Sequence, residues 1–127
     1  MVQGSRYVAG GGTVGWGWGP RLRSRVANLL CRWFLGSPHE STTNFRVYNR
    51  QSVRLAVEES QARDFEFQPE CTLIAMRHGL RIVEAPITFT ARAEGKSKLG
   101  MAQNVRWLLF FAGAFLGYRL GIGRFSR

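Results

Sequence analysis

The stretch from Phe65 to Leu99 constrains the fold more than any other part of this chain of 127 residues. Its sequence, FEFQPECTLIAMRHGLRIVEAPITFTARAEGKSKL, predicts a helix followed by strand and turn. Pro69 suits the first turn of a helix, where its missing N–H costs nothing, and Gly79 is a normal helix stop. After Pro86, apolar and polar residues alternate, which is strand spacing. The pattern therefore indicates helical and extended elements in succession.

The predicted strand leads into a basic turn from Arg92 to Lys98, which holds three cations, a hydroxyl and a glycine. Such a turn suits a phosphate, because a guanidinium binds two oxygens and lysines act as point charges. Gly95 lets the backbone approach the ligand closely. Taken alone, the turn is equally consistent with a solvated surface loop.

The charge balance is strongly basic, with 18 lysines and arginines against 8 acidic residues and a net charge of +10. This balance implies an anionic partner, which can be nucleic acid, an anionic membrane surface or a phosphorylated ligand. The hydrophobic fraction of 45% argues against disorder. The two cysteines, Cys31 and Cys71, have no metal-like spacing and indicate a reduced, cytoplasmic compartment.

Two further helices are predicted in the first half of the chain. Apolar residues recur at helical spacing from Pro20 to Leu35, between a proline start and the stop at Gly36. Gln51 to Arg63 reads as an amphipathic scaffold helix. The stretch AGGGTVGWGWGP, which ends at Pro20, predicts a flexible loop, and its tryptophans suit folding over a ligand or membrane.

The last apolar stretch runs from Ala102 to Leu120. Its uncharged part, Trp107 to Tyr118, has 12 residues and lies between Arg106 and Arg119. A bilayer-spanning helix needs about twenty residues, so a full span is not expected. Two interpretations stay open: an interfacial helix on an anionic membrane, or a core helix that covers the sheet.

Five motifs in this order resemble the polyprenyl-phosphate glycosyltransferases of glycosyltransferase family 2, and most closely the dolichol-phosphate mannosyltransferases. They are G-S-R-Y-V-x-G-G from residue 4, R-x-x-S-R-x-x-N from residue 21, and F-x-F-Q-x-E, G-x-x-I-x-E-x-P-I-x-F and R-x-x-G-x-S-K-L between residues 65 and 99. The resemblance implies an α/β fold: residues 1–100 form the C-terminal portion of a GT-A-type, Rossmann-like domain. Residues 101–127 then form an apolar membrane-interface or core-covering helix with a basic tail.

The resemblance implies transfer of a sugar, most specifically mannose from GDP-mannose, to dolichyl or polyprenyl phosphate by an inverting enzyme. The partners are then a nucleotide sugar, the lipid phosphate and the cytoplasmic face of a membrane, without nucleic acid. Since the acceptor phosphate is already an anion, positioning and charge stabilisation dominate the chemistry.

Individual site residues follow from the same motifs. Residues implied to contact the donor diphosphate and its leaving charge are Arg6, Gln68, Arg92 and Lys98. Residues implied to hold the acceptor phosphate are Arg21, Ser24 and Arg46. Residues implied to be catalytic are Glu70, Arg92 and Lys98. Glu70 is implied to orient sugar or acceptor groups; the alternative is a structural role as an early-helix carboxylate favoured by the helix dipole. The alternative for Arg6 is an exposed N-terminal charge.

One motif departs from the family pattern. Residues 40–46 read E-S-T-T-N-F-R, where the family has D-x-T-S-G-F-R. Thr42, Phe45 and Arg46 are kept, and Glu40 is one methylene longer than aspartate. Two interpretations of Arg46 stay open: a phosphate ligand, or the partner of Glu40 in a structural ion pair.

The acidic D-x-D motif that holds magnesium or manganese and the nucleotide in this family is absent, because Asp64 is the only aspartate. We therefore expect a truncated chain without metal ligands of its own, inactive alone, with exposed sheet edges and apolar surface. The competing hypothesis is a non-catalytic basic module that binds anionic membrane or nucleic acid.

Overall fold

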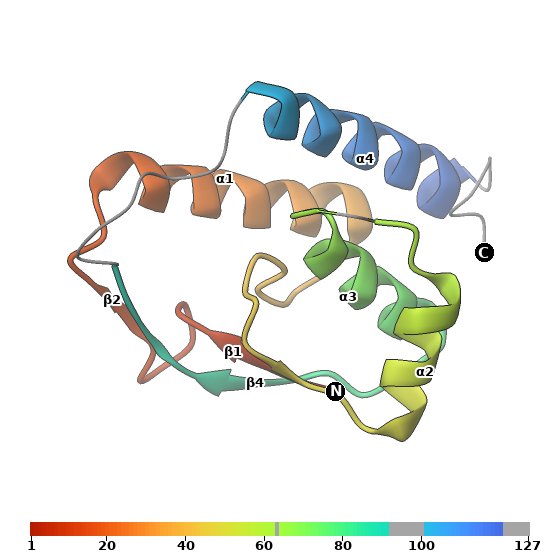
Figure 1. Ribbon diagram of the computed structural model, residues 1–127, viewed down its shortest axis with the longest axis horizontal. Helices are drawn as coiled ribbons and strands as arrows, with labels where there is room; N and C mark the ends of the chain where they lie inside the picture. The colour runs from red at the N-terminus through yellow and green to blue at the C-terminus, as the bar shows by residue number, and fades with distance from the viewer. Residues whose placement is uncertain (63, 92–100, 121–127) are drawn as a thin grey trace.

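The computed structural model describes residues 1–62, 64–91 and 101–120, with the backbone only for residues 101–104, 118 and 119. The predicted mixture of helices and strands is confirmed (Figure 1). In chain order the described elements are β1 (Val2–Ser5), β2 (Gly12–Val14), α1 (Trp18–Leu35), β3 (Arg46–Val47), α2 (Arg50–Glu59), α3 (Phe67–Arg77), β4 (Val83–Pro86), β5 (Thr88–Thr90) and α4 (Met101–Leu120).

The strands form two small sheets. The first has the order β3-β1-β4, in which β1 runs parallel to β4 and antiparallel to β3. The second pairs β2 with β5 in parallel. The prediction of a flexible loop was wrong for Gly12–Val14. This segment forms a strand because its backbone hydrogen-bonds to a segment some 75 positions later in the chain, where the Gly12 N–H donates to the Ile87 carbonyl at 3.0 Å.

Local signals placed the helices well. Helix α1 ends where predicted, because Gly36 takes a left-handed conformation with φ of 68° and its N–H bonds to the Arg32 carbonyl. Gly79 ends α3 with φ of 62°. Helix α2 stops at Glu59, earlier than the predicted Arg63, which lies outside the described residues. Ser60 leaves the helix because its hydroxyl donates to the Glu70 carboxylate at 2.6 Å.

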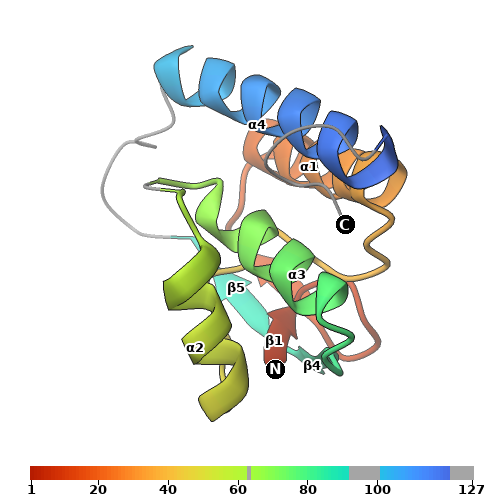
Figure 2. The ribbon, with the colours of Figure 1, turned by 90° about the vertical axis from the view of Figure 1, so that its right-hand side faces the viewer.

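Helix α4 packs along α1, and these two helices form a layer above α3 and the sheets (Figures 1 and 2). A core cluster joins three helices through Cys31, Leu35, Leu73, Phe110, Phe111 and Ala114. Helix α4 therefore contributes side chains to the core, and its main packing partner is α1 rather than a strand. Its aromatic residues find partners on α1, as in the edge-to-face contact of Phe115 with Phe34 at 5.3 Å.

Candidate functional site

Arg6 follows directly on β1 and forms a buried ion pair with Glu40. Its Nε donates to Glu40 Oε1 at 2.7 Å, Nη2 donates to the same oxygen, and the Arg6 backbone N–H donates to Oε2 at 2.6 Å. The two side chains are only 7% and 1% exposed. The interpretation of Arg6 as an exposed N-terminal charge is therefore wrong, since Arg6 is a cation held in one position.

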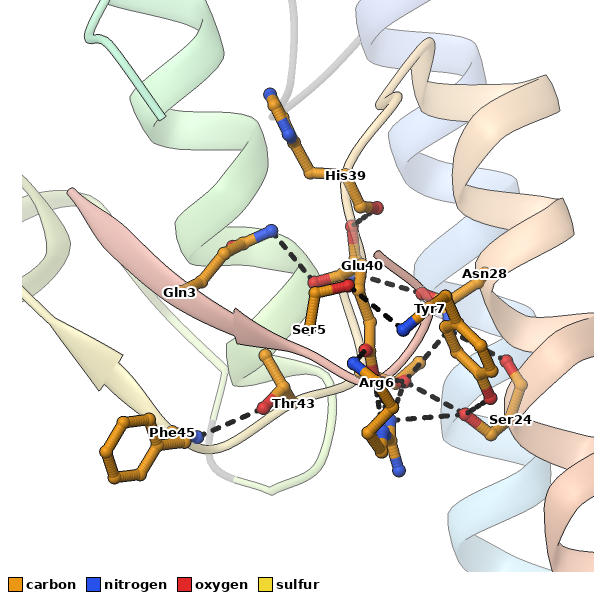
Figure 3. A network of polar contacts seen from close by, with 12 residues as sticks. Gln3, Ser5, Arg6, Tyr7, Ser24, Asn28, His39, Glu40, Thr43 and Phe45 are labelled. Atoms are coloured by element: carbon orange, nitrogen blue, oxygen red, sulfur yellow. Dashed lines mark hydrogen bonds and ion pairs between the residues drawn. The ribbon is translucent and has the colours of Figure 1, made fainter. Parts of the chain in front are cut away.

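Hydroxyl groups surround the Arg6 guanidinium on its other side (Figure 3). Nη2 donates to Thr42 Oγ1 at 2.8 Å and to Ser24 Oγ at 3.2 Å. The Tyr7 hydroxyl donates to Ser24 at 2.9 Å. Within the described residues Nη1 makes no hydrogen bond, so this nitrogen keeps its donors available for a ligand.

Glu40 is clamped through its own backbone as well. Its N–H donates to the Glu84 carboxylate on β4 at 2.9 Å, and its carbonyl accepts a bond from Gln3 Nε2 at 2.9 Å. Figure 3 shows the Gln3 side chain directed from β1 toward the backbone of Glu40 in the loop after α1. This clamp directs the carboxylate at Arg6.

Aromatic rings complete the surroundings of Arg6. Its guanidinium carbon lies 4.8 Å from the Trp16 ring centroid, 5.6 Å from Tyr7 and 5.7 Å from Phe89. Trp16 and Phe89 are themselves in contact, with centroids 4.9 Å apart. The facing rings attract the cation and keep water away from it, which strengthens its electrostatic interactions.

A cavity of about 550 Å³ opens beside Arg6. One end is polar, and the wall between α1 and α4 is apolar. The polar end is lined by Arg6, Ser24, Thr42, Asn44 and Gln68; the apolar wall includes Val26, Ala27, Leu30, Trp107, Leu108 and Phe111. Such a cavity suits an anionic group that is joined to an apolar chain.

The structure brings three of the predicted site residues together here, namely Arg6, Ser24 and Gln68. Arg21 lies nearby but does not line the cavity; its Nη2 donates to the Trp16 carbonyl at 3.4 Å. Its Nε is buried and has no partner among the described residues. The roles implied for these residues stay predictions.

Arg46 lies apart from the cavity. Its guanidinium donates to the carbonyls of Thr43 at 3.1 Å and Ser41 at 3.2 Å, and burial lowers its pKa. The expected alternative of an Arg46–Glu40 ion pair is wrong, because Glu40 is clamped toward Arg6. The implied contact of Arg46 with an acceptor phosphate stays a prediction.

Glu70 is 1% exposed and does not line the cavity. It accepts hydrogen bonds from the Ser60 hydroxyl and from the backbone N–H groups of Gln61 and Ala62 at 2.6, 3.2 and 2.8 Å. These contacts support its structural interpretation, since they tie the end of α2 to α3. Its catalytic role stays a prediction.

The basic turn, with the predicted residues Arg92 and Lys98, lies outside the described residues. The last residue described before it, Ala91, donates its N–H to the Val14 carbonyl at 2.9 Å. The chain therefore enters this turn from β5, the strand that carries Phe89 next to Arg6.

In the described part of the chain, no cluster of three or more histidine, cysteine, aspartate or glutamate side chains can hold a metal. The family resemblance places the ligands of a magnesium or manganese ion outside this chain, and this expectation stays a prediction.

Sequence reasoning missed two features of the site. It did not pair Glu40 with Arg6, and it did not place Trp16 over the guanidinium. Glu40 and Arg6 are 34 positions apart, and neither residue carries a local signal of the contact. Only the family motifs, which single out both positions, pointed to this part of the chain.

Comparison with known proteins confirms the resemblance. The chain is 36% identical over 112 residues to polyprenol monophosphomannose synthase of Mycolicibacterium smegmatis, a match that covers 87% of this chain and 42% of that protein. It is 32% identical over 131 aligned positions to undecaprenyl-phosphate mannosyltransferase of Micrococcus luteus. That match covers 96% of this chain and 54% of that protein. The chain thus spans about half the length of these relatives. No family model and no solved structure matches it.

Proposed function

Because the chain is related over most of its length to polyprenyl-phosphate mannosyltransferases, we propose that it forms the lipid-phosphate-binding part of such an enzyme. The reaction is transfer of mannose from GDP-mannose to a polyprenyl phosphate at the cytoplasmic face of a membrane. The single observation that carries this proposal is the buried cation Arg6 at the polar end of an apolar-walled cavity.

The cavity supports an acceptor with two unlike ends. A phosphate monoester at the polar end meets the Nη1 donors of Arg6, the hydroxyl of Ser24 and the Gln68 amide. This proposal gives Arg6 and Gln68 an acceptor role in place of the donor role that the resemblance implies. The isoprenoid chain then follows the apolar wall between α1 and α4, where burial of its methylene groups contributes to affinity. Arg23 also lines this cavity and adds positive charge.

The proposed chemistry is a single displacement at the anomeric carbon. An oxygen of the lipid phosphate forms the new bond to that carbon as the bond to the nucleoside diphosphate breaks, which inverts the configuration. The acceptor oxygen is already negatively charged, so no proton has to be removed. The protein screens the two anions and aligns them, and Arg92 and Lys98 are proposed to stabilise the leaving diphosphate.

The layer of α1 and α4 supports placement at a membrane surface. In the described part of the chain, both helices keep large apolar residues exposed that do not line the cavity: Trp18, Leu29 and Trp33 on α1, and Val105, Leu109, Leu116 and Leu120 on α4. Exposed arginines at 23, 25, 32 and 106 accompany them. Apolar residues with flanking cations suit an anionic bilayer interface. None of the described helices has the length and apolarity that a bilayer span requires.

No observation favours the alternative of a nucleic-acid-binding module. Two of the arginines that suggested it, Arg6 and Arg46, are held inside the protein by a carboxylate and by backbone carbonyls.

Calorimetry on the purified chain tests the acceptor site. It compares the affinity of the chain for farnesyl phosphate with its affinity for farnesol. Gln68→Glu puts a negative charge at the polar end with little change in shape. At an effective dielectric of 20, two charges about 4 Å apart repel by roughly 4 kcal/mol, so we expect at least about tenfold weaker binding of the phosphate.

Gln51→Glu is the matched control, because it makes the same change on the exposed start of α2. It should leave binding unchanged. Equal affinity for farnesol and farnesyl phosphate, or full affinity in Gln68→Glu, would remove the proposed phosphate site.

A further inference from the structure

Glu84 belongs to the motif G-x-x-I-x-E-x-P-I-x-F, and the proposed reaction leaves its side chain without a role. It lies on β4, where it is paired with Gln3 of the parallel strand β1. Residues paired in this way direct their side chains to the same face of a sheet. Gln3 and Glu84 therefore reach the same loop, the one after α1, and both bind Glu40 there.

The two side chains hold both backbone polar groups of Glu40. Gln3 Nε2 donates to the Glu40 carbonyl, and the Glu40 N–H donates to Glu84 Oε1, each at 2.9 Å. The other carboxylate oxygen of Glu84 lies 3.5 Å from His39 Nδ1, so the carboxylate is held on that side as well. A hydrogen bond to a carboxylate is stronger than one to a neutral acceptor, so Glu84 gives the stronger of the two attachments.

The side chain of Glu40 passes this position on to Arg6. Its Oε1 accepts from Arg6 Nε at 2.7 Å and from Nη2, and its Oε2 accepts the Arg6 backbone N–H at 2.6 Å. A guanidinium is planar and rigid, so contacts at Nε and Nη2 also fix the direction of Nη1. A displaced Glu40 backbone would therefore turn Nη1 away from the place proposed for the phosphate.

Glu84 does not line the cavity beside Arg6. It lines a second cavity of about 320 Å³, and the two cavities share no lining residue. An effect of Glu84 on phosphate binding must therefore pass through Glu40 and Arg6, because the Glu84 side chain does not contact a ligand in the first cavity.

We propose that Glu84 is a positioning residue for the phosphate of the polyprenyl phosphate, acting through the backbone of Glu40 and the guanidinium of Arg6. The inference rests on the proposed function, which assigns the polar end of the cavity to this phosphate. A misplacement of about 1 Å in an aligned site can cost about 100-fold, so loss of the Glu84 attachment should weaken phosphate binding at least about tenfold.

Calorimetry on the folded chain compares farnesyl phosphate with farnesol in two Glu84 variants. Glu84→Met keeps the length of the side chain but removes the acceptor for the Glu40 N–H. It should weaken binding of farnesyl phosphate at least about tenfold and leave farnesol within about twofold. Glu84→Gln keeps an oxygen at the same place and should retain the wild-type affinity for both ligands. Glu58→Met makes the matched change in an exposed side chain of α2 and should have no effect.

Glu84→Asp gives a second test if Glu84→Met does not fold. It keeps the charge and the acceptor but shortens the reach by one methylene group, so it should also weaken farnesyl phosphate and spare farnesol. A purely structural role of Glu84 predicts equal losses for the two ligands, because both need the folded chain. Equal losses, or a failure of Glu84→Gln to retain phosphate affinity, would overturn the proposal.

NMR of nitrogen-labelled arginine side chains measures the position of Arg6 without any ligand. The Arg6 Nε–H signal, identified by its loss in Arg6→Lys, should shift in Glu84→Met and stay in place in Glu84→Gln. A wild-type chain that binds farnesyl phosphate no better than farnesol would remove the proposed function, while a shifted signal would still support the link from Glu84 to Arg6. An unshifted signal in Glu84→Met would overturn that link.

Discussion

At the scale of single residues, the Arg6–Glu40 pair links the stability of the chain to its candidate site. Both charges are almost fully buried, and their desolvation is offset by several hydrogen bonds to each group. A buried pair of this kind contributes little net stability over an apolar pair, but removing one partner leaves an uncompensated charge. The network therefore holds one nitrogen of Arg6 toward the cavity at a fixed position.

Glu40→Gln should lower the free energy of unfolding by about 3 kcal/mol, because it leaves the Arg6 cation buried without a counter-charge. Urea denaturation measures the change. Glu58→Gln breaks the exposed Arg54–Glu58 pair on α2 and should have an effect close to the error of the measurement. Equal losses in the two variants would show that the Arg6–Glu40 pair behaves like a surface pair.

At the scale of elements, α1 and α4 share two tasks. Their contact side forms the core through residues such as Cys31 and Phe111, and the cavity wall lies between them. Other positions on both helices keep leucines, a valine and tryptophans exposed to solvent. One pair of helices thus packs the fold, lines the candidate lipid site and offers an apolar surface beside it.

Leu109→Glu should weaken binding of the chain to vesicles that contain phosphatidylglycerol, by about tenfold or more. Leu109 is 68% exposed on α4 and does not line the cavity, so the change removes apolar contact and adds repulsion without touching the candidate site. Co-sedimentation measures the bound fraction. Val57→Glu on α2 serves as control and should bind like the wild type; similar losses for both variants would contradict an interface on α1 and α4.

At the scale of the whole molecule, the chain combines two surfaces. The exposed apolar residues of α1 and α4 suit a membrane, and the cavity beside Arg6 suits a lipid phosphate. Ala91, the last described residue before the basic turn, follows β5, the strand that carries Phe89 next to Arg6.

In a complete enzyme that joins this chain to the remaining part of a relative, Arg92→Ala or Lys98→Ala should lower kcat by about 100-fold. The reason is that negative charge develops on the leaving diphosphate, and one lost stabilising contact costs about that factor. Arg32→Ala, an exposed change on α1, should stay within about twofold of the wild type. Mannosyl transfer to a polyprenyl phosphate is the readout, and equal activity in all three variants would remove the role assigned to the turn.

Local signals in the sequence determined the helices. Helix α1 begins at Trp18, two residues before the predicted start, and Pro20 lies in its first turn. Pro20, and Gly36 and Gly79 at the left-handed helix ends, act through local backbone geometry, so the sequence suffices to predict their effect. The family motifs likewise singled out Arg6, Ser24 and Gln68, which the fold brings to one cavity.

Contacts between distant positions were decided only by the tertiary structure. Strand β2 forms in a glycine-rich stretch because β5 supplies its partners, and Glu40 binds Arg6 instead of Arg46 because Gln3 and Glu84 clamp its backbone. The pairing of β1 with β3 and β4 likewise depends on contacts between distant segments. Such choices follow from hydrogen bonds and packing between segments tens of residues apart, for which neither partner carries a local signal.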